Sequence, residues 1–540
     1  MKKILQKILV AGITAGSLIF TPQIYNPNLI LTVQAEVKKY DGEGKYLMSD
    51  FEDAEIAKQR ARARAEQAAK DKAGIYLSQY SVVENFNLTK NEISAVTNNI
   101  LSTVGEVKYE MQLDTVEGMP VVIYTATLQA NIDTDEIKNW LNLDENKKNQ
   151  VIEQSIEIKK ISEENNNRIE NLKTQYNHAT SQAEKDKIHA EIVSIDKEFL
   201  AIQKFAEGNK YSYFKNYEQS IKLYNEALQL YPNFSEAYNN RGTVYRELKQ
   251  YDAALSDFDK AIELDPNNAN AYGNRGIVYD ELKQYDKAII NHNKSIGLNP
   301  NSAIKYSNRG VTYNKLQMYD AAISDFNKAI QLDPNYFYAY NNLGVTYGFL
   351  QDYQKEIENL NIAIKLNPYS ADSYYNRGLS YANSMDFNAA VSDFNKAIEL
   401  NPNLAEAHYN LGIIFGMSGK YDDAIAEFSK AIELNPNYDD AYNNRAYTYY
   451  LAKKYKKALA DCNKAIEINP DNFFAYGNRG MVYTKMGKYD KAILDLDKAI
   501  QMGNTDGEIF YSRGICNRKR GKTNDANADF AKAKELGYNG

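Results

Sequence analysis

Residues 235–266 read SEAYNNRGTVYRELKQYDAALSDFDKAIELDP, and close copies of this stretch follow one another with a period of 34 residues from Ala201 to Gly540. Glycine recurs in one register at Gly208, Gly242, Gly276, Gly310, Gly344, Gly378, Gly412, Gly480 and Gly514, and only Ala446 breaks the column. Aromatic and proline residues recur with the same period. Self-similarity at a fixed period of this size predicts a solenoid of stacked units.

Each unit has the pattern of two helices joined by a turn. In residues 235–266, apolar side chains recur at helical spacing on either side of the polar turn at residues 249–252. Pro266 ends the second helix, because proline cannot continue a helix. A glycine inside a helix costs about 1 kcal/mol relative to alanine, so Gly242 indicates that two helices cross closely there. One such hairpin cannot bury both of its apolar stripes, whereas a stack of hairpins can.

The unit resembles the tetratricopeptide repeat family. That family has an aromatic, a small and an aromatic residue, then alanine, phenylalanine, alanine and proline at set offsets, and the matching residues here are Tyr238, Gly242, Tyr245, Ala254, Phe258, Ala261 and Pro266. The resemblance covers ten repeats, residues 201–540. It implies a mainly α fold, a right-handed α-solenoid of ten 34-residue helix-turn-helix repeats, in which the first helix of each pair lines a concave groove.

One position departs from the family, which usually has an apolar residue just before the small one. Arginine stands there in seven repeats, at Arg241, Arg275, Arg309, Arg377, Arg445, Arg479 and Arg513. Sixteen residues later these repeats have Asp257, Asn291, Asp325, Asp393, Asp461, Asp495 and Asp529. The repeats with Leu343 and Leu411 instead have Asn359 and Glu427. We therefore predict a recurring Arg–Asp ion pair, either within one hairpin or between adjacent hairpins.

Residues 1–35 have the pattern of a signal peptide. Lys2 and Lys3 are basic, residues 8–20 are apolar, and residues 33–35 offer small side chains for cleavage. The apolar core is shorter than the about 20 residues of a membrane span, although an uncleaved N-terminal anchor remains the alternative. We expect an exported protein, periplasmic or in the cell envelope, with no integral membrane span in the mature chain.

Residues 36–142 are expected to form a small α+β domain. A long helix is predicted from Asp50 to Gly74, with an alanine face that suits close packing on a sheet. Its arginines Arg60, Arg62 and Arg64 are expected to point to water, with an anion site as the alternative.

The rest of this domain is predicted as a second helix and a β-hairpin. Thr89 and Glu92 form a capping box that opens a helix through Val104. Alternating apolar residues in 107–113 and 122–132 predict two paired strands around a turn at residues 117–118. The order of elements resembles the N-terminal domain of the flagellar H-ring protein T and related secreted lipoprotein domains.

Residues 143–200 are predicted to form an antiparallel helical hairpin, a coiled-coil linker. Two apolar seams change phase near residues 178–182, where Ser181 and Glu184 form another capping box. The second helix continues without a breaker into the first repeat, so the hairpin could cover the apolar end of the solenoid.

The sequence contains no catalytic, cofactor or metal motif. There is no GxSxG, HExxH or phosphate loop, and residues 504–507 resemble the start of a calcium loop without its closing acid. Cys462, His292 and His408 replace aromatic residues of other repeats and are expected to be packing substitutes. The net charge is −7 and no basic patch marks a nucleic-acid partner. We expect no enzyme, no cofactor and no metal.

The groove that the resemblance implies would be lined by the first helices. An asparagine column falls there at Asn240, Asn274, Asn308, Asn342, Asn376, Asn410, Asn444 and Asn478. An amide could bind the main chain of an extended peptide, or it could tie adjacent helices together. Further candidates in the middle and later repeats are Tyr338, Asn341, Phe349, Tyr375, Tyr409, Tyr450 and Phe474. Aromatic and amide side chains together are typical of a protein-binding surface.

We therefore predict an exported, non-catalytic scaffold that binds a partner protein or peptide in the groove, within a cell-envelope assembly. The alternative is a carbohydrate- or cell-wall-binding protein, in which tyrosines such as Tyr375 and Tyr409 stack on sugars. The pattern points to no particular oligomeric state.

Overall fold

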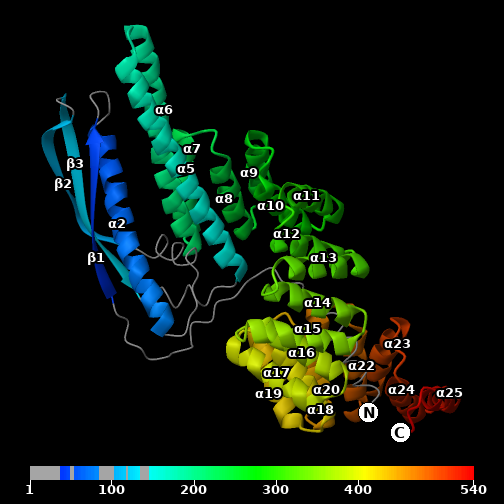
Figure 1. The fold of residues 1–540 in the computed structure, drawn as a ribbon. Coiled ribbons are helices and arrows are strands. Elements are labelled where there is room, and N and C mark those ends of the chain that lie inside the picture. Colours follow the sequence, from blue (N-terminus) through cyan, green and yellow to red (C-terminus); the bar gives the residue numbers. More distant parts are fainter. Residues whose placement is uncertain (1–36, 49–53, 84–101, 117–118, 134–144) are drawn as a thin grey trace. The chain divides into compact units, whose positions relative to one another are not determined.

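The computed structural model describes residues 37–48, 54–83, 102–116, 119–133 and 145–540 (Figure 1). The described chain forms two compact units, one that ends at Met318 and one that runs from Tyr319 to Gly540. The predicted signal peptide and most of the predicted helix after Thr89 lie outside the described residues. Val104, expected in that helix, instead belongs to a strand.

The α+β domain has three antiparallel strands in the order β1-β3-β2. Strands β2 (Ser102–Val116) and β3 (Met119–Asp133) form the predicted hairpin, in which Met111 pairs with Tyr124. Strand β1 (Val37–Met48) pairs with the other edge of β3 and was not predicted. Helix α2 (Ala54–Val83) packs on β1 and β3 and buries a column of alanines completely, Ala57, Ala61, Ala65, Ala69 and Ala73.

The expectation that Arg60 points to water is wrong. Its side chain is 3 % exposed, and its Nη2 donates to Asp196 Oδ1 at 2.7 Å, with Asp196 buried to the same degree. The guanidinium also lies 4.7 Å from the centre of the Phe199 ring. Arg62, two residues on, pairs with Glu66 at the surface as expected. Arg60 thus connects α2 to the helical hairpin through a buried ion pair.

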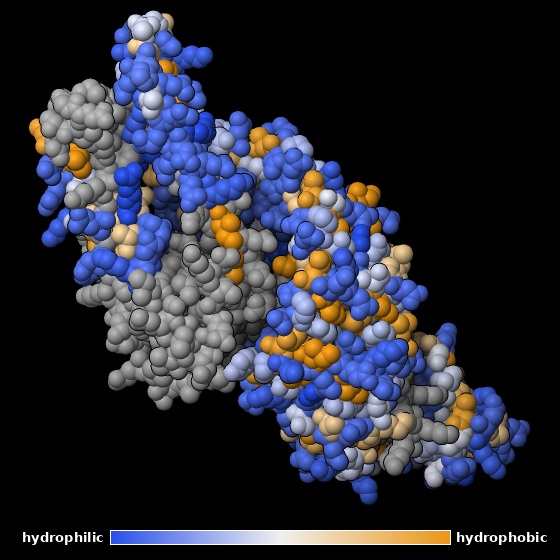
Figure 2. Space-filling view, viewed as in Figure 1, coloured by the Kyte–Doolittle hydropathy of each residue, from blue (hydrophilic) through white to orange (hydrophobic). Residues whose placement is uncertain are grey.

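The helical hairpin consists of α5 (Glu145–His178) and α6 (Gln182–Tyr213). Ile169, Leu172, Ile188, Ile192 and Ile195 fill the seam between the two helices. Ser181 caps α6 by accepting from the backbone N–H of Glu184 at 3.3 Å. The tip of the hairpin, at the top of the view, is mostly hydrophilic, with a few apolar residues among the polar ones (Figure 2). Helix α6 runs unbroken into the first repeat, as predicted.

Residues 217–535 form a regular helix-turn-helix array. After the end of α6, the first helices of the pairs are α8 (Ser235–Glu247), α10 (Ala269–Glu281), α12 (Ala303–Lys315), α14 (Phe337–Phe349), α16 (Ala371–Asn383), α18 (Ala405–Met417), α20 (Asp439–Leu451), α22 (Phe473–Lys485) and α24 (Gly507–Lys519). The second helices are α7 (Tyr217–Leu230), α9 (Tyr251–Leu264), α11 (Tyr285–Leu298), α13 (Tyr319–Leu332), α15 (Tyr353–Leu366), α17 (Phe387–Leu400), α19 (Tyr421–Leu434), α21 (Tyr455–Ile468), α23 (Tyr489–Gln501) and α25 (Thr523–Glu535).

The recurring glycine allows the two helices of a hairpin to pack closely, as its position suggested. In α18, a Cβ built on Gly412 would lie 2.7 Å from the ring of Phe428, and Phe428 is buried in α19. The same contact recurs at 2.8 Å between Gly378 and Phe394. Where an aromatic ring faces this position, the two helices of a hairpin therefore cross too closely for a Cβ, and the repeat with Ala446 has Cys462 in place of the ring.

The predicted Arg–Asp pairs are formed wherever both residues lie in one unit: Arg241–Asp257, Arg377–Asp393, Arg445–Asp461, Arg479–Asp495 and Arg513–Asp529. Arg377 shows the geometry, since its Nε and Nη2 donate to the two Asp393 oxygens at 2.7 Å each. Its Nη1 donates to Asn361 Oδ1 on the preceding second helix at 2.7 Å. Each arginine thus closes its own hairpin and also joins it to the hairpin before, which sequence alone left open.

This ladder of arginines is expected to carry measurable stability. Arg377→Leu copies a residue that the chain itself uses at Leu343, but it leaves the buried Asp393 carboxylate unpaired, so α16 and α17 should lose about 2–3 kcal/mol. Hydrogen exchange of the full chain measures this loss locally. The double variant R377L/D393N copies the Leu343–Asn359 repeat and should recover part of it. A double variant as unstable as the single one would contradict this role of the ion pair.

Candidate functional site

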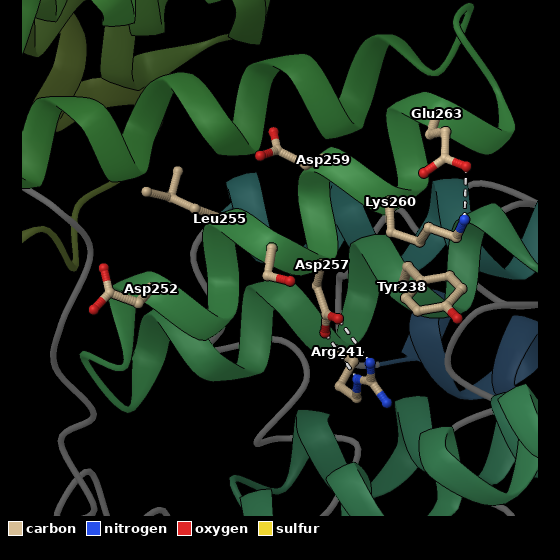
Figure 3. Close-up of a pocket in the computed structure, with 9 residues that line it drawn as sticks. Tyr238, Arg241, Asp252, Leu255, Asp257, Asp259, Lys260 and Glu263 are labelled. Carbon is tan, nitrogen blue, oxygen red and sulfur yellow. Dashed lines mark hydrogen bonds and ion pairs between the residues drawn. The ribbon is translucent and has the colours of Figure 1, made fainter.

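One pocket of about 650 Å³ lies on the flank of the hairpin α8–α9 (Figure 3). Figure 3 shows that its polar groups point at each other, Arg241 at Asp257 and Lys260 at Glu263. The Arg241 Nη2 lies 2.7 Å from Asp257 Oδ1, and the Lys260 ammonium lies 2.7 Å from the Glu263 carboxylate. Burial raises the pKa of Asp257 and the Arg241 guanidinium opposes this rise. The first pair belongs to the arginine ladder and the second is a surface pair within α9, so we assign this pocket a structural role.

The asparagine column ties consecutive first helices together. The side-chain amide of Asn478 donates to Asn443 Oδ1 at 2.8 Å, and Asn444 donates to the Tyr409 hydroxyl at 2.9 Å, each on the preceding first helix. Asn240, Asn274, Asn376 and Asn410 make the equivalent bonds. Asn308 and Asn342 are half-buried. Of the two roles that the sequence allowed, the structure therefore shows the helix tie.

The aromatic and amide candidates fall into two groups. Tyr375, Tyr409 and Asn341 are buried, and they accept hydrogen bonds from the next first helix. Tyr450 is also buried, and together with Tyr447 it donates to the Glu508 carboxylate at 3.3 Å. Tyr338, Phe349 and Phe474 are half-buried, and Phe349 stacks on Tyr319 with ring centres 5.5 Å apart. The second group leaves part of each ring accessible to a partner.

Three carboxylates on the first helices were missed by the sequence reading, Asp372, Glu406 and Asp440. Each is the second residue of its helix, in α16, α18 and α20. Burial raises the pKa of Asp372 to about 7, and burial together with Asp439 raises that of Asp440 to about 6. Asp372 is half-buried and Asp440 exposed, so both remain accessible to a partner. They share a repeat position with Tyr338 and Phe474, and following that column would have revealed them.

The cysteine and the two histidines that replace aromatic residues of other repeats lie in packed or hydrogen-bonded positions. Cys462 is completely buried, as predicted, and its pKa is raised by burial. His292 is buried with its Nε2 3.2 Å from Asp280 Oδ2. His408 Nδ1 lies 2.6 Å from Glu427 Oε2, so this histidine meets the acid that replaces aspartate in the Leu411 repeat.

Two properties of the described residues bear on cofactors and membranes. No group of three or more histidine, cysteine, aspartate or glutamate side chains within those residues is placed to hold a metal ion. Within the same ranges, no helix combines the length and the apolar character that a membrane span needs.

Comparison with known proteins identifies the repeats. A tetratricopeptide repeat model matches residues 235–268, 303–336, 371–404, 405–438, 439–472 and 473–502, and a second model of this repeat matches 258–290 and 326–358. None of the curated proteins matches the chain.

Solved structures of repeat proteins are similar to parts of it. YrrB, described as a TPR protein with an unusual peptide-binding site, is 28% identical over 34% of this chain and 95% of its own, with a TM-score of 0.30. MamA is 28% identical and covers 32% of this chain and 94% of its own, with a TM-score of 0.27. A chain of the Cut9–Hcn1 hetero-tetramer of APC/C is 14% identical and covers 60% of this chain and 76% of its own, with a TM-score of 0.41. On the family models and the helical array, this chain is a tetratricopeptide repeat protein.

Proposed function

We propose that the protein is an exported, non-catalytic scaffold that binds a partner protein or peptide along the first helices of its repeats. Tetratricopeptide repeats generally bind proteins or peptides. The observation that carries the proposal is the direct bonding of each first helix to the next, from Asn376 to Asn341 and onward to Asn478 and Asn443. These bonds join the first helices of residues 337–485 into one continuous surface.

The two sides of the repeats differ in how their charges are compensated. The second helices α17, α19 and α21 carry exposed lysine–glutamate pairs three residues apart, for example Lys430–Glu433 at 2.9 Å. Pairs of this kind are typical of a solvated helix face. The first helices α14 to α22 instead present half-buried rings at Tyr338 and Phe474, and the carboxylates of Asp372, Glu406 and Asp440, which form no ion pair with any described residue. A partner therefore gains more contacts on the first-helix side.

The test is a photo-crosslinking amino acid placed on either side of the same repeats. At Glu406, on first helix α18, it should capture a partner in the native organism, and at the exposed Glu433, on second helix α19, it should capture none. Equal capture from both positions, or from Glu433 alone, would contradict a binding surface on the first helices.

The proposed export and cell-envelope location rest on residues 1–35. The supporting feature is the basic start followed by a short apolar core. Protease added to cells with a permeabilised outer layer should degrade the protein, whereas it should be protected when residues 1–35 are deleted. In this proposal the α+β domain provides a second attachment within an envelope assembly.

The carbohydrate-binding alternative has less support. It required the rings of Tyr375 and Tyr409 to stack on sugars, but these side chains are 2 % and 3 % exposed. Tyr409 instead packs on Tyr438, with ring centres 4.9 Å apart. We therefore retain the protein or peptide as the partner.

A further inference from the structure

We propose that the partner binds through an extended segment rich in lysine or arginine, held by a strip of three carboxylates. This acidic strip consists of Asp372 on α16, Glu406 on α18 and Asp440 on α20. The inference rests on the proposed function, because it names the chemistry of the segment that the first-helix surface recognises.

No basic side chain of the described residues, whether lysine, arginine or histidine, forms an ion pair with the acidic strip. Helix α18 contains no lysine or arginine. The arginines of α16 and α20 are Arg377 and Arg445, and both guanidinium groups are bound to the aspartates of the ladder. The missing positive charge is therefore left to a partner.

A purely structural role for these acids is the competing explanation. A carboxylate in the first turn of a helix normally stabilises that helix, which lowers its pKa. Here burial raises the pKa of Asp372 and of Asp440 above the usual value. Ser370 caps α16 by accepting from the backbone N–H of Ser373, so Asp372 is not the cap. The local structure of α16 therefore gives Asp372 no capping role.

A second observation beside the strip points to a donor that is missing. Asn410, one turn after Glu406, is 4 % exposed, and its Nδ2 donates to the Glu406 carbonyl and the Tyr375 hydroxyl at 2.9 and 3.3 Å. Its Oδ1 is buried and has no hydrogen-bond donor in the part of the chain that the structure describes. The pKa of Tyr375 is raised by burial and by the nearby Glu406 carboxylate, so ring, amide and acid lie together. A cationic side chain bound at Glu406 would supply this donor once the Asn410 side chain turns toward it, and a buried acceptor gains from being satisfied.

The spacing of the strip favours a polymer over a small ion. The described acids do not converge on a metal site. Packed helices lie about 8–10 Å apart, and an extended chain advances about 3.3 Å per residue, so cations at every third residue would meet successive carboxylates. Tyr338 and Phe474 occupy the equivalent position on α14 and α22, at the two ends of the strip. Their half-buried rings suit aromatic or cationic side chains that flank the basic stretch.

The first experiment measures binding of a labelled, extended peptide with lysine at every third position to the full chain. The variant D372N/E406Q/D440N should bind at least tenfold more weakly. The matched control E399Q/E433Q/E467Q removes the same charge from the second helices of the same repeats, where the three glutamates are exposed, and should bind within twofold of the unchanged protein. Binding should also weaken as salt is raised, because exposed charges are screened. Equal losses in both variants, or no loss in the strip variant, would overturn the inference.

Two further experiments are needed. The first distinguishes a basic peptide from a small polyamine, and the second distinguishes failure of this inference from failure of the proposed scaffold function. Spermine should not displace the peptide at equal concentration, and tighter binding of spermine would overturn the assignment to a peptide. Selection from an unbiased peptide library with the full chain should enrich lysine and arginine at spacings of two or three residues. Enrichment of other sequences that crosslink at Glu406 would overturn the basic segment and leave the scaffold function standing. A library that yields no binder at all would count against both.

Discussion

Replacing Arg60 with methionine is expected to destabilise the packing of α2 on the helical hairpin by about 3–5 kcal/mol, because it leaves the Asp196 carboxylate buried and unpaired. Hydrogen exchange should show the loss in α2 and α6, while the repeats from Tyr319 onward keep their protection. The size of the effect follows from burial, since both side chains are 3 % exposed.

The control for this prediction lies on the same helix. Arg62→Met removes a surface pair with Glu66, four residues on, and such pairs contribute only about 0.3–0.5 kcal/mol. The double variant R60M/D196L should recover much of the loss, because it replaces both charges with apolar groups. An R60M variant no less stable than R62M would show that the ion pair does not hold the domain to the hairpin.

Replacing Glu356 with alanine is expected to stabilise α15 and its neighbours above neutral pH. In the equivalent position of the flanking repeats, Ala322 and Ala390 are completely buried. Glu356 is itself 6 % exposed, and its Oε2 has no hydrogen-bond donor among the described residues. Room for it exists because residue 348 is glycine, whose added Cβ would lie 2.6 Å from Glu356 Oε1.

The pH dependence of this effect follows from the pKa of Glu356. Burial raises that pKa from 4.5 to about 8. The folded state therefore keeps the proton between pH 4.5 and 8 while the unfolded state loses it, so stability falls as pH rises through this window. At about 1.4 kcal/mol per pH unit, the loss is on the order of 4 kcal/mol by pH 8. Hydrogen exchange of α14 and α15 measured across this range should show the fall in the unchanged protein. E356A should remove this contribution and leave only the smaller one expected from Asp372 on α16, whose pKa is about 7.

A matched control again lies close by. Glu358 is exposed on the same helix, so E358A should leave the pH profile of α15 unchanged. A fall in E356A as large as in the unchanged protein would show that Glu356 does not cause it.

Much of the fold could be predicted because the same residue pattern recurs in successive repeats. The period of 34 residues, the glycine opposite Phe428 and the link between Arg377 and Asp393 each recur, so chance agreement at one position does not mislead. The single-copy α+β domain gives no such repetition. Its strand β1 went unpredicted, and Arg60 was placed in water because a lone arginine on a polar helix face is usually solvated.

The candidate site was predicted less well than the fold. The asparagine column was found, but an amide such as Asn444 can serve a peptide or a neighbouring helix equally well, and only the contact with Tyr409 shows the second. Tyr375 was expected to line the groove because the family resemblance places groove residues on the first helices, yet its ring is buried beside Phe394. The acids Asp372 and Asp440 were not singled out, because carboxylates are frequent throughout the repeats and only the structure shows which of them lack a partner among the described residues.

The sequence by itself determined the repeated helix pair, its boundaries and its close crossing, because these depend on side-chain size and spacing along one chain. Tertiary structure alone decided which polar groups are already satisfied. Asn478 donates a hydrogen bond to the preceding first helix, and Arg60 forms an ion pair with a helix more than a hundred residues away. The carboxylates of the acidic strip form no ion pair with any residue that the structure describes. The physical reason is that the free energy of a polar side chain depends on the partner and on the burial that folding provides, and neither is a property of its own place in the sequence.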